Sequence, residues 1–453
     1  MCGIAGFCNF KEDFEENTDY WNFRLEKMRA VLAHRGNDAR GRYLKKHIGL
    51  SHSRLAIRDI LCGDQPMTRT HNGYEYTICY NGEIYNTDEL IPELSENGFV
   101  CSTTSDTEVI LYAYIHWGAD FVSRLNGIFA FAIWDAAKNR LLLYRDRVGV
   151  KPLFYAIRGD SLVFGSEPKA CFAHPAVKPE LDKQGLQELL AIGPAHTSGL
   201  SLFKDLFEVL PGHFMIYTRD GLHDETYWEL TSREHTESYH DTVAHTRFLV
   251  EDAIKRQMVS DVPVCTFLSG GIDSSIVTAI AANYMNTRGK TLNTFSFDFK
   301  DNDRYFKANA FQPERDLPYV NRMLEEYETA HSYLECDENS LFKALFAAVD
   351  AKDMPGMTDV DSSLLYFCSL VSRKNKVALT GECADEIFGG YPWFYRKELL
   401  ERYGFPWSSD VAPRLALLRD DVGLELDLSG YQAFRYEESR SKAPLLYGEA
   451  GED

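Results

Sequence analysis

Short runs of apolar residues, some alternating with polar residues and some unbroken, dominate the first half of the chain. Turn-forming pairs such as Asn72-Gly73 separate these runs at close spacing, which is typical of antiparallel strands joined by tight turns. In this half, helical periodicity appears at residues 20–33 and 105–117. We therefore predict an antiparallel β domain with some helices, whose strands include residues 74–80, 128–134, 140–144, 153–157, 162–165 and 213–217.

From residue 238 the pattern changes. The predicted elements are, in order, an amphipathic helix at residues 242–258, a strand at 262–268, a helix of small residues at 274–285 and a strand at 292–299. Strand, helix and strand at this spacing predict a βαβ unit and hence a parallel sheet. The change of class places the domain boundary at residues 220–231, between a first domain at 2–220 and a second at 232–453.

Composition narrows the class of protein. The chain has 453 residues, of which 45% are hydrophobic, and 48 basic against 68 acidic residues give a net charge of −20. Such a charge argues against coating a nucleic acid, although a local site can still bind an anion. The ten cysteines form no Cys-x-x-Cys pair, which favours reduced thiols. No apolar run approaches a membrane span or a secretory signal, so we expect a cytoplasmic protein without a membrane partner.

Cys2 becomes the terminal residue if Met1 is removed. The α-amino group, with a reference pKa of about 8, can then take the thiol proton, and the thiolate can attack an amide carbonyl. We expect Asn81 and Gly82 to form a turn after the strand at 74–80, where a side-chain amide and a backbone N–H could stabilise the oxyanion. Taken singly, Cys2 is equally a packed thiol and Asn81-Gly82 an ordinary hairpin turn; their combination favours amide hydrolysis.

A second candidate site follows the predicted strand at 262–268. Residues 267–275 place Ser269, Gly270 and Gly271 between a strand and a helix. Paired glycines let the backbone approach an anion, and the helix N-terminus attracts it. The segment is not a Walker loop, because the chain contains no Gly-x-x-x-x-Gly-Lys-Ser/Thr run. A structural turn is the alternative interpretation.

Residues 377–391 repeat this arrangement of strand, glycine and helix. Here the first turn of the helix is acidic, and its carboxylates could converge with Asp273 on Mg²⁺. Helix capping by first-turn acids is the alternative, and it is weakened by the presence of the upstream loop. The sequence therefore predicts a phosphate-binding site with a metal ion in the second domain.

Six motifs in the first half resemble the glutaminase domain of class II, N-terminal-nucleophile (Ntn) amidotransferases. They lie at residues 1–6, 34–36, 53–57, 63–67, 80–86 and 105–108. The resemblance implies an antiparallel αββα Ntn-hydrolase sandwich with Cys2 as nucleophile and Asn81 and Gly82 as oxyanion hole. A zwitterionic amino acid needs one fixed cation and one fixed anion, and the implied glutamine-binding residues are Arg54, Leu55, Ile57, Asn81, Gly82, Glu83 and Asp106.

The two glycine-containing segments of the second half resemble the ATP pyrophosphatase (PP-loop, adenine nucleotide alpha hydrolase-like) domain of glutamine-hydrolysing asparagine synthetases. The resemblance implies that Asp273 and Asp385 bind Mg²⁺ and that Glu382 lies at the acceptor carboxyl as a candidate base. The residues implied to contact ATP are Leu268, Ser269, Gly270, Gly271, Asp273, Ser274, Phe297, Thr380 and Gly381.

The combined resemblance predicts synthesis of asparagine from aspartate, with ammonia from glutamine and a β-aspartyl-AMP intermediate. The expected partners are glutamine, aspartate and MgATP, with no organic prosthetic group; the oligomeric state stays open, a homodimer included. The second domain argues against phosphoribosyl and hexosamine-phosphate amidotransferases, and the intact Cys2 site against a β-lactam-forming synthetase. A glutaminase without synthetase activity, a binding paralogue and amidation of another carboxylate are the remaining alternatives.

Family members continue past the point where this sequence stops, at residues 448–453. In family members, that continuation holds a lysine that contacts the phosphates. No residue of this sequence can be assigned to that role. We therefore expect a second domain truncated at its C-terminus, which favours glutaminase activity over full synthesis and predicts an exposed apolar face.

Overall fold

The structure is a computed structural model and describes residues 1–308, 314–408 and 410–442. The chain divides into two compact units, Met1–Thr231 (unit 1) and Ser232–Asp453 (unit 2). The expected C-terminal truncation concerns residues 448–453, which lie outside the described residues. None of the helices in the described ranges is both long and apolar enough to cross a bilayer.

Unit 1 is built on two six-stranded sheets in which every neighbouring pair is antiparallel. The first sheet contains, in spatial order, β10 (Phe207–Glu208), β8 (Phe154–Arg158), β9 (Ser161–Gly165), β1 (Gly3–Asn9), β3 (Ile48–Arg54) and β2 (Ala39–Lys45). The second contains β12 (Gly221–Thr226), β11 (His213–Thr218), β7 (Arg140–Arg145), β6 (Gly127–Asp135), β5 (Tyr74–Ile84) and β4 (Met67–His71). The six strand ranges expected from the sequence all contain observed strands.

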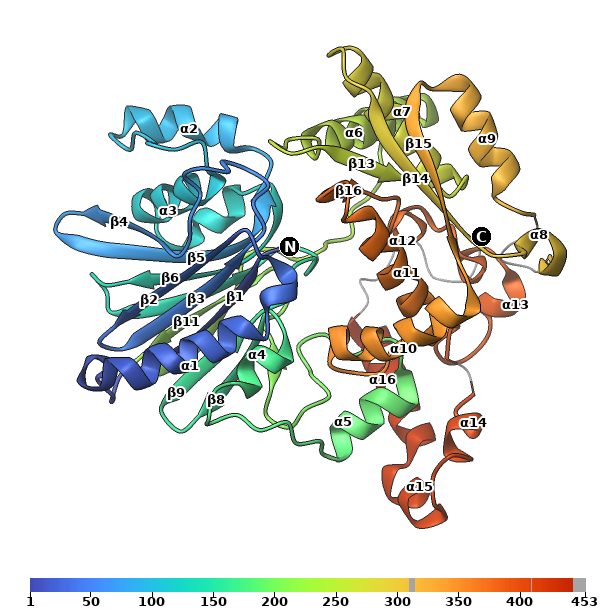
Figure 1. Cartoon of the computed structure of the whole chain (residues 1–453). Coiled ribbons are helices and arrows are strands. Elements are labelled where there is room, and N and C mark those ends of the chain that lie inside the picture. The colour runs from blue at the N-terminus through green and yellow to red at the C-terminus, as the bar shows by residue number, and fades with distance from the viewer. Residues whose placement is uncertain (309–313, 409, 443–453) are drawn as a thin grey trace. The chain divides into compact units, whose positions relative to one another are not determined.

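Helices cover the outer face of each sheet, which completes an αββα sandwich (Figure 1). On the first sheet lie α1 (Thr18–Ala30) and α4 (Pro168–Phe172), and on the second lie α2 (Thr87–Glu96) and α3 (Asp106–Trp117). A short helix, α5 (Lys183–Gln187), follows in the chain. The predicted Ntn-type architecture of the N-terminal part is therefore confirmed.

Both faces of the central strands are buried, because each sheet packs against the other sheet and against helices. Along β6, Phe129, Phe131 and Ile133 enter the core beneath α2 and α3, while Ala130 and Ala132 enter the core between the sheets. Each large side chain buried in this way contributes roughly 1.5–3 kcal/mol. This double burial fixes the register of the strands that carry the candidate site.

The last strand of unit 1, β12, lies inside the stretch expected to separate the domains. It pairs with β11 in the antiparallel sense, with Gly221 opposite Thr218 and Thr226 opposite His213. The first unit therefore extends beyond residue 220, because the hairpin closes the edge of the second sheet.

Unit 2 contains a four-stranded sheet in which all neighbouring strands are parallel. Its spatial order is β15 (Thr329–Cys336), β14 (Leu292–Phe299), β13 (Val264–Phe267) and β16 (Val377–Leu379). The predicted βαβ unit is confirmed, with α7 (Ile272–Asn286) between β13 and β14. The fold is thus a two-domain α/β architecture with an antiparallel first part and a parallel second part.

Helices cover both faces of the parallel sheet. On β13, Val264 packs in a cluster with residues of α7, while Cys265 packs with Phe367 of α11 (Thr358–Val371). The remaining described helices are α6 (Tyr239–Arg256), α8 (Asn302–Tyr305), α9 (Leu317–Glu326), α10 (Glu338–Lys352), α12 (Ala384–Phe388), α13 (Lys397–Leu400), α14 (Ala412–Leu415), α15 (Asp420–Leu426) and α16 (Leu428–Lys442).

Candidate active sites

The Cys2 thiol in unit 1 is held by strand pairing. Because β1 pairs with β3 in the antiparallel register Gly3 to Ser53, Cys2 lies at the end of β3, where Arg54 and Leu55 follow. The thiol accepts a hydrogen bond from the Leu55 N–H (3.4 Å) and donates one to the Leu55 carbonyl (3.6 Å). The Arg35 Nε donates to the carbonyl of Cys2 at 2.9 Å. The thiol therefore has a defined position before any substrate binds.

Burial works against ionisation of this thiol. It raises the pKa of Cys2, an effect that the hydrogen bond from the Leu55 N–H and the charge of Arg54 oppose. The Glu83 carboxyl raises the same pKa further. Cys2 consequently needs a base and nearby positive charge to become a nucleophile.

The predicted turn at Asn81 and Gly82 is wrong. Both residues lie within β5, where Asn81 pairs with Ala130 and Gly82 with Phe129 of β6. Pairing with β6 continues to Ile84, so the strand runs straight through the Asn-Gly pair. A Cβ at position 82 would lie 2.3 Å from the Ile128 carbonyl oxygen, so close backbone approach requires glycine there.

Asn81 nevertheless presents a free donor. Its side chain is buried, and Nδ2 has no hydrogen-bond partner in the described part of the chain. A buried N–H₂ group without a partner is costly, and it is the feature expected of a donor that waits for an oxyanion. The strand thus offers the side-chain donor that the turn was expected to offer.

A small pocket joins the Cys2 thiol to most of the predicted glutamine-binding residues. Its lining is formed by Cys2, Arg54, Leu55, Ile57, Arg58, Gly63, Gln65, Tyr80, Gly82, Glu83, Ser105, Asp106 and Thr107. The structure therefore brings together seven of the eight residues predicted around this site, and Asn81 lies next to them in β5.

Arg54 is buried in this pocket and already partnered. Its guanidinium donates to the carbonyl oxygens of Asp59 (2.6 Å) and Ile60 (3.2 Å) and pairs with Asp64 at 3.0 Å. These contacts fold residues 58–64 around it. A substrate carboxylate at Arg54 would share the guanidinium with this loop.

Two carboxyl groups that line the pocket, those of Glu83 and Asp106, interact electrostatically. Asp106 begins α3 and accepts hydrogen bonds from the Tyr80 hydroxyl (2.8 Å) and the Ile84 N–H (3.1 Å). Glu83 has a buried Oε2 without a partner among the described residues. Burial, followed by the charge of Asp106, raises the pKa of Glu83 to about 8. An ammonium group entering the pocket would relieve both the missing contact and the repulsion.

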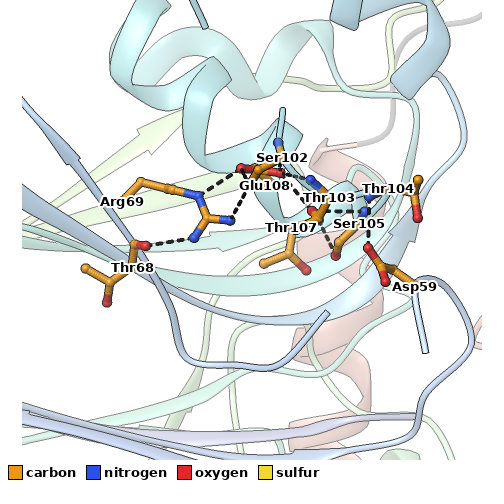
Figure 2. A network of polar contacts seen from close by, with 9 residues as sticks. All are labelled: Asp59, Thr68, Arg69, Ser102, Thr103, Thr104, Ser105, Thr107 and Glu108. Carbon is orange, nitrogen blue, oxygen red and sulfur yellow. Dashed lines mark hydrogen bonds and ion pairs between the residues drawn. The ribbon is translucent and has the colours of Figure 1, made fainter. Parts of the chain in front are cut away.

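A buried carboxylate outside the pocket fixes the segment that carries Asp106 (Figure 2). Glu108 accepts hydrogen bonds from the backbone N–H groups of Ser102 and Thr103 at 2.9 and 2.7 Å, and from Arg69 Nε at 2.8 Å. Burial alone would raise its pKa, but the hydrogen bonds from Thr103, Arg69 and Ser102 lower it to about 2. Glu108 is therefore ionised and holds the start of α3 in place.

The candidate phosphate loop of unit 2 lies between β13 and α7, as the sequence predicts. Gly270 has φ +88°, a conformation that favours glycine. Ser274 Oγ donates to the Gly271 carbonyl at 3.1 Å and accepts from the Ser269 N–H at 3.2 Å. These hydrogen bonds shape the turn without using the N-terminal N–H groups of α7.

The second segment meets this loop at its base. A Cβ on Gly381 would lie 2.8 Å from both Asp273 Cβ and the Ser274 nitrogen, so the turn after β16 touches the first turn of α7. Burial, followed by the charge of Asp385, raises the pKa of Asp273. The structure thus places Asp273 and Asp385 close enough to influence each other.

The position of these loops in the sheet is that of a ligand site. β13 has β14 on one side and β16 on the other, so the strand order reverses between β13 and β16. Ligands of open parallel sheets bind at such a switch point, outside the carboxyl ends of the strands. Both candidate loops leave the sheet there.

The other predicted residues of unit 2 lie toward the same carboxyl ends of the strands. Leu268 follows β13, and its N–H donates to the Phe295 carbonyl at 2.8 Å. Phe297 packs against Phe367 at 5.1 Å between ring centroids. Thr380 and Glu382 are exposed, and the Glu382 N–H donates to Thr380 Oγ1 at 3.4 Å. Among the described residues no group of three or more His, Cys, Asp or Glu side chains forms a protein-only metal site.

Comparison with known families covers both units. Residues 1–228 match the model of a glutamine amidotransferase domain, and residues 245–453 match that of asparagine synthase. The chain is 47% identical to asparagine synthetase [glutamine-hydrolyzing] 3 of Bacillus subtilis (strain 168), over 100% of this chain and 73% of that protein. The chain belongs to the glutamine-hydrolysing asparagine synthetase family. Its members are ligases that take their name from glutamine hydrolysis and asparagine formation.

Another asparagine synthetase of the same organism, number 1, is 33% identical over 88% of this chain and 60% of its own length. The chain thus spans 73% and 60% of the lengths of these two synthetases. Among solved structures, a glutamine phosphoribosylpyrophosphate amidotransferase of B. subtilis with ADP and GMP matches with a TM-score of 0.40. The identity is 16%, over 87% of this chain and 98% of that one.

Arg58 is a pocket residue of this synthetase-family chain that sequence reasoning missed. Its guanidinium donates to the Ile84 carbonyl at 2.9 Å and to Thr87 Oγ1 at 3.3 Å. It also lowers the pKa of both Glu83 and Asp106. The signal was the charge balance, because two acidic residues assigned to one buried pocket call for more than the single cation of Arg54.

Proposed function

We propose that this member of the family makes asparagine from aspartate and MgATP, with nitrogen released from glutamine in unit 1. The observation that carries the proposal is the pair of unpartnered buried groups around the Cys2 thiol. Asn81 Nδ2 offers a donor where an amide oxygen would become negative, and Glu83 Oε2 offers an acceptor for an ammonium group. These groups complement the amide and the amino group of glutamine.

The first reaction begins at the thiol. In the chain from which Met1 has been removed, the α-amino group of Cys2 takes the thiol proton and sulfur attacks the glutamine amide. Asn81 and the Gly82 N–H stabilise the oxyanion, and the amine gives its proton to the leaving nitrogen. Water then hydrolyses the thioester to glutamate. Arg54 and Asp106 hold the substrate carboxylate and amino group, with Leu55, Ile57 and Glu83 completing the pocket.

The second reaction uses the switch point of unit 2. The turn formed by Ser269, Gly270 and Gly271 and the N-terminus of α7 cradle the phosphates, while the adenylate lies against residues Leu268, Phe297, Thr380 and Gly381. Asp273 and Asp385 fit a hard cation, because they are carboxylates placed close together. Mg²⁺ bound there would offset the charge of the pyrophosphate.

Aspartate is activated by this site as an acyl-adenylate. A carboxylate is a poor electrophile, and attack of its oxygen on the α-phosphate replaces a bad leaving group by AMP, with release of pyrophosphate. Ammonia then attacks the activated carbonyl, and Glu382 takes a proton from it. The products are asparagine, AMP and pyrophosphate.

Product analysis tests this proposal directly. The chain is incubated with amide-¹⁵N-glutamine, MgATP and aspartate, and the products are identified by mass. We expect ¹⁵N-asparagine, glutamate, AMP and pyrophosphate in equal amounts. Glutamate without asparagine would overturn the synthetase part, and ADP with inorganic phosphate would overturn the adenylate step.

A further inference from the structure

Lys151 is a buried lysine that the reaction described above does not use. Its side chain is 8% exposed, and Nζ lies 3.0 Å from the sulfur of Met1. It forms no ion pair with a carboxylate in the described part of the chain. Burial lowers the pKa of this lysine, and the charges of Glu83 and Asp146 oppose that effect. Because a buried ammonium group without an ion pair is costly, its retention beside the chain terminus calls for a reason.

The segment after β7 holds this lysine in place from one side. The buried carboxylate of Asp146 accepts hydrogen bonds from the N–H groups of Val150 (2.9 Å) and Lys151 (2.9 Å). It also accepts one from the Phe129 N–H of β6 at 3.1 Å. The tight turn at residues 146–151 is therefore attached to the second sheet.

A buried arginine holds the same segment from the other side. Arg145 Nε donates to the Lys151 carbonyl at 3.1 Å, and its Nη2 donates to the Gly149 carbonyl at 3.1 Å. Gly149 itself has φ +72°, which favours glycine. The backbone of Lys151 is thus fixed by hydrogen bonds, and its ammonium group contacts Met1 at the chain terminus.

The terminus faces charged groups from several elements. Arg35 after α1, Arg54 of β3 and Lys151 after β7 are positive, and Glu83 of β5, with a pKa of about 8, becomes negative as the pH rises past that value. In the chain that retains Met1, burial lowers the pKa of the terminal amine to about 5; the charges of Arg35 and Lys151 contribute to this shift, and those of Cys2 and Glu83 oppose it. The charge of the Cys2 thiolate in turn raises the pKa of Lys151.

We propose that Lys151 is a positioning residue of the glutaminase site, whose ammonium group keeps the α-amine of the mature Cys2 unprotonated at neutral pH. This inference rests on the proposed function, since it concerns the amine that acts as base. The amine takes the thiol proton when sulfur attacks and returns it to the leaving nitrogen. An amine weakened by a neighbouring cation is free to accept the first proton and is a better acid for the second transfer.

The sign of the pH dependence follows from the charge. A positive group nearby disfavours the protonated amine, so it lowers the pKa of that amine. Lys151→Met removes the cation and nearly keeps the length of the side chain. The α-amine then holds its proton to higher pH. The acid limb of kcat/KM for glutamine should therefore move up by about one pH unit. Lys151→Arg keeps the charge and should leave the limb within about 0.3 unit of the wild type.

The experiment uses the full chain, whose loss of Met1 is verified by intact mass. Glutamate release is measured from pH 5 to 10 for the wild type, Lys151→Met and Lys151→Arg. The matched control is Lys11→Met, because Lys11 forms a surface ion pair with Asp160 at 2.9 Å and lies outside the pocket. Lower kcat/KM at every pH with an unmoved acid limb would reduce Lys151 to a packing role and overturn the inference.

A second readout separates this inference from the proposed function. Cys2 is alkylated with iodoacetamide across the same pH range, and its labelling is read from the N-terminal peptide by mass. We expect the pH at which labelling is half-maximal to rise in Lys151→Met and to be unchanged in Lys151→Arg. A wild type that releases no glutamate but shows this shift would contradict the proposed function and keep the inference, whereas an unchanged midpoint would overturn the inference.

Discussion

The two units carry their candidate chemistry in different ways. In unit 1 it lies on buried or half-buried side chains, with Cys2, Asn81 and Asp106 each held by strand pairing or hydrogen bonds before a substrate arrives. In unit 2 it lies on a turn and on exposed side chains such as Ser269 and Glu382. Attack on an amide needs atoms placed to within a fraction of an ångström, whereas phosphates are recognised largely by backbone N–H groups and a metal ion.

The apolar cores inside the two units differ as well. Unit 1 has three continuous apolar layers, beneath α1, between the sheets and beneath α3. The described apolar clusters around the sheet of unit 2 are smaller, and α6 has no buried residue. We infer that unit 1 can hold unpartnered polar atoms because the surrounding core supplies the stability that such atoms cost.

The largest expected effect is that of Cys2→Ala. Loss of the nucleophile should reduce glutamine-dependent asparagine formation by more than roughly 10³-fold. Synthesis from added ammonia should stay within about twofold of the wild type, because Cys2 belongs to unit 1 and the proposed synthetase site belongs to unit 2. Parallel assays with glutamine and with ammonium chloride measure both rates, and an equal loss of both would show that the two sites are not separable.

Asn81→Ala tests the pre-formed donor of unit 1. We expect kcat for glutamate release to fall by about 10²–10³, with little change of Tm, because Nδ2 has no described partner to lose. The matched control is Asn86→Ala, which removes hydrogen bonds to Arg124 and Asn126 and should lower Tm while sparing kcat. A large loss of stability in Asn81→Ala would contradict a donor held free for the substrate.

Gly271→Ala tests the cradle of unit 2. A Cβ there would meet only Ser269 Oγ, at 3.6 Å, so the free protein has room for it. If the backbone of this turn approaches the pyrophosphate, KM for MgATP in ammonia-dependent synthesis should rise roughly tenfold at unchanged Tm. Glutamate release without ATP should stay the same. Unchanged KM for MgATP would place the phosphates elsewhere.

Glu83→Gln gives the smallest and most pH-dependent effect. Burial raises the pKa of Glu83 to about 8, above the usual value for a glutamate, so ionisation opposes folding as pH rises from about 4.5 to about 8. The variant should melt roughly 2–4 °C above the wild type at pH 8 and level with it at pH 4.5, while KM for glutamine rises. Equal melting temperatures at both pH values would contradict a strained carboxyl in the pocket.

Much of the fold was predictable because alternation along a strand reflects which face is buried. The six predicted strand ranges and the βαβ unit needed only such local patterns. The turn at Asn81 and Gly82 was predicted wrongly because an Asn-Gly pair signals a hairpin locally, while pairing of β5 with β6 is a contact between distant segments. The strand β12 was missed for a different reason, because it is an edge strand of mostly exposed residues and therefore has no apolar alternation.

The site was predictable where a motif names residue types, and less so where burial decides. Cys2, Arg54, Glu83 and Asp106 came together as expected, but Arg58 was found only in the structure. No pattern in the sequence shows that two buried carboxyl groups line one pocket, and the need for a second cation follows from that burial. The same holds for Lys151, whose position depends on a turn fixed by hydrogen bonds.

Covalent trapping in unit 1 tests the central claim most directly. The chain is treated with a glutamine analogue that carries an electrophile in place of the amide, and the peptides are identified by mass. The account predicts one adduct, on a peptide that begins with Cys2, which glutamine prevents and ATP does not. Glutamate release by a chain that begins with Met1, or by a chain whose Cys2 stays unmodified, would contradict it.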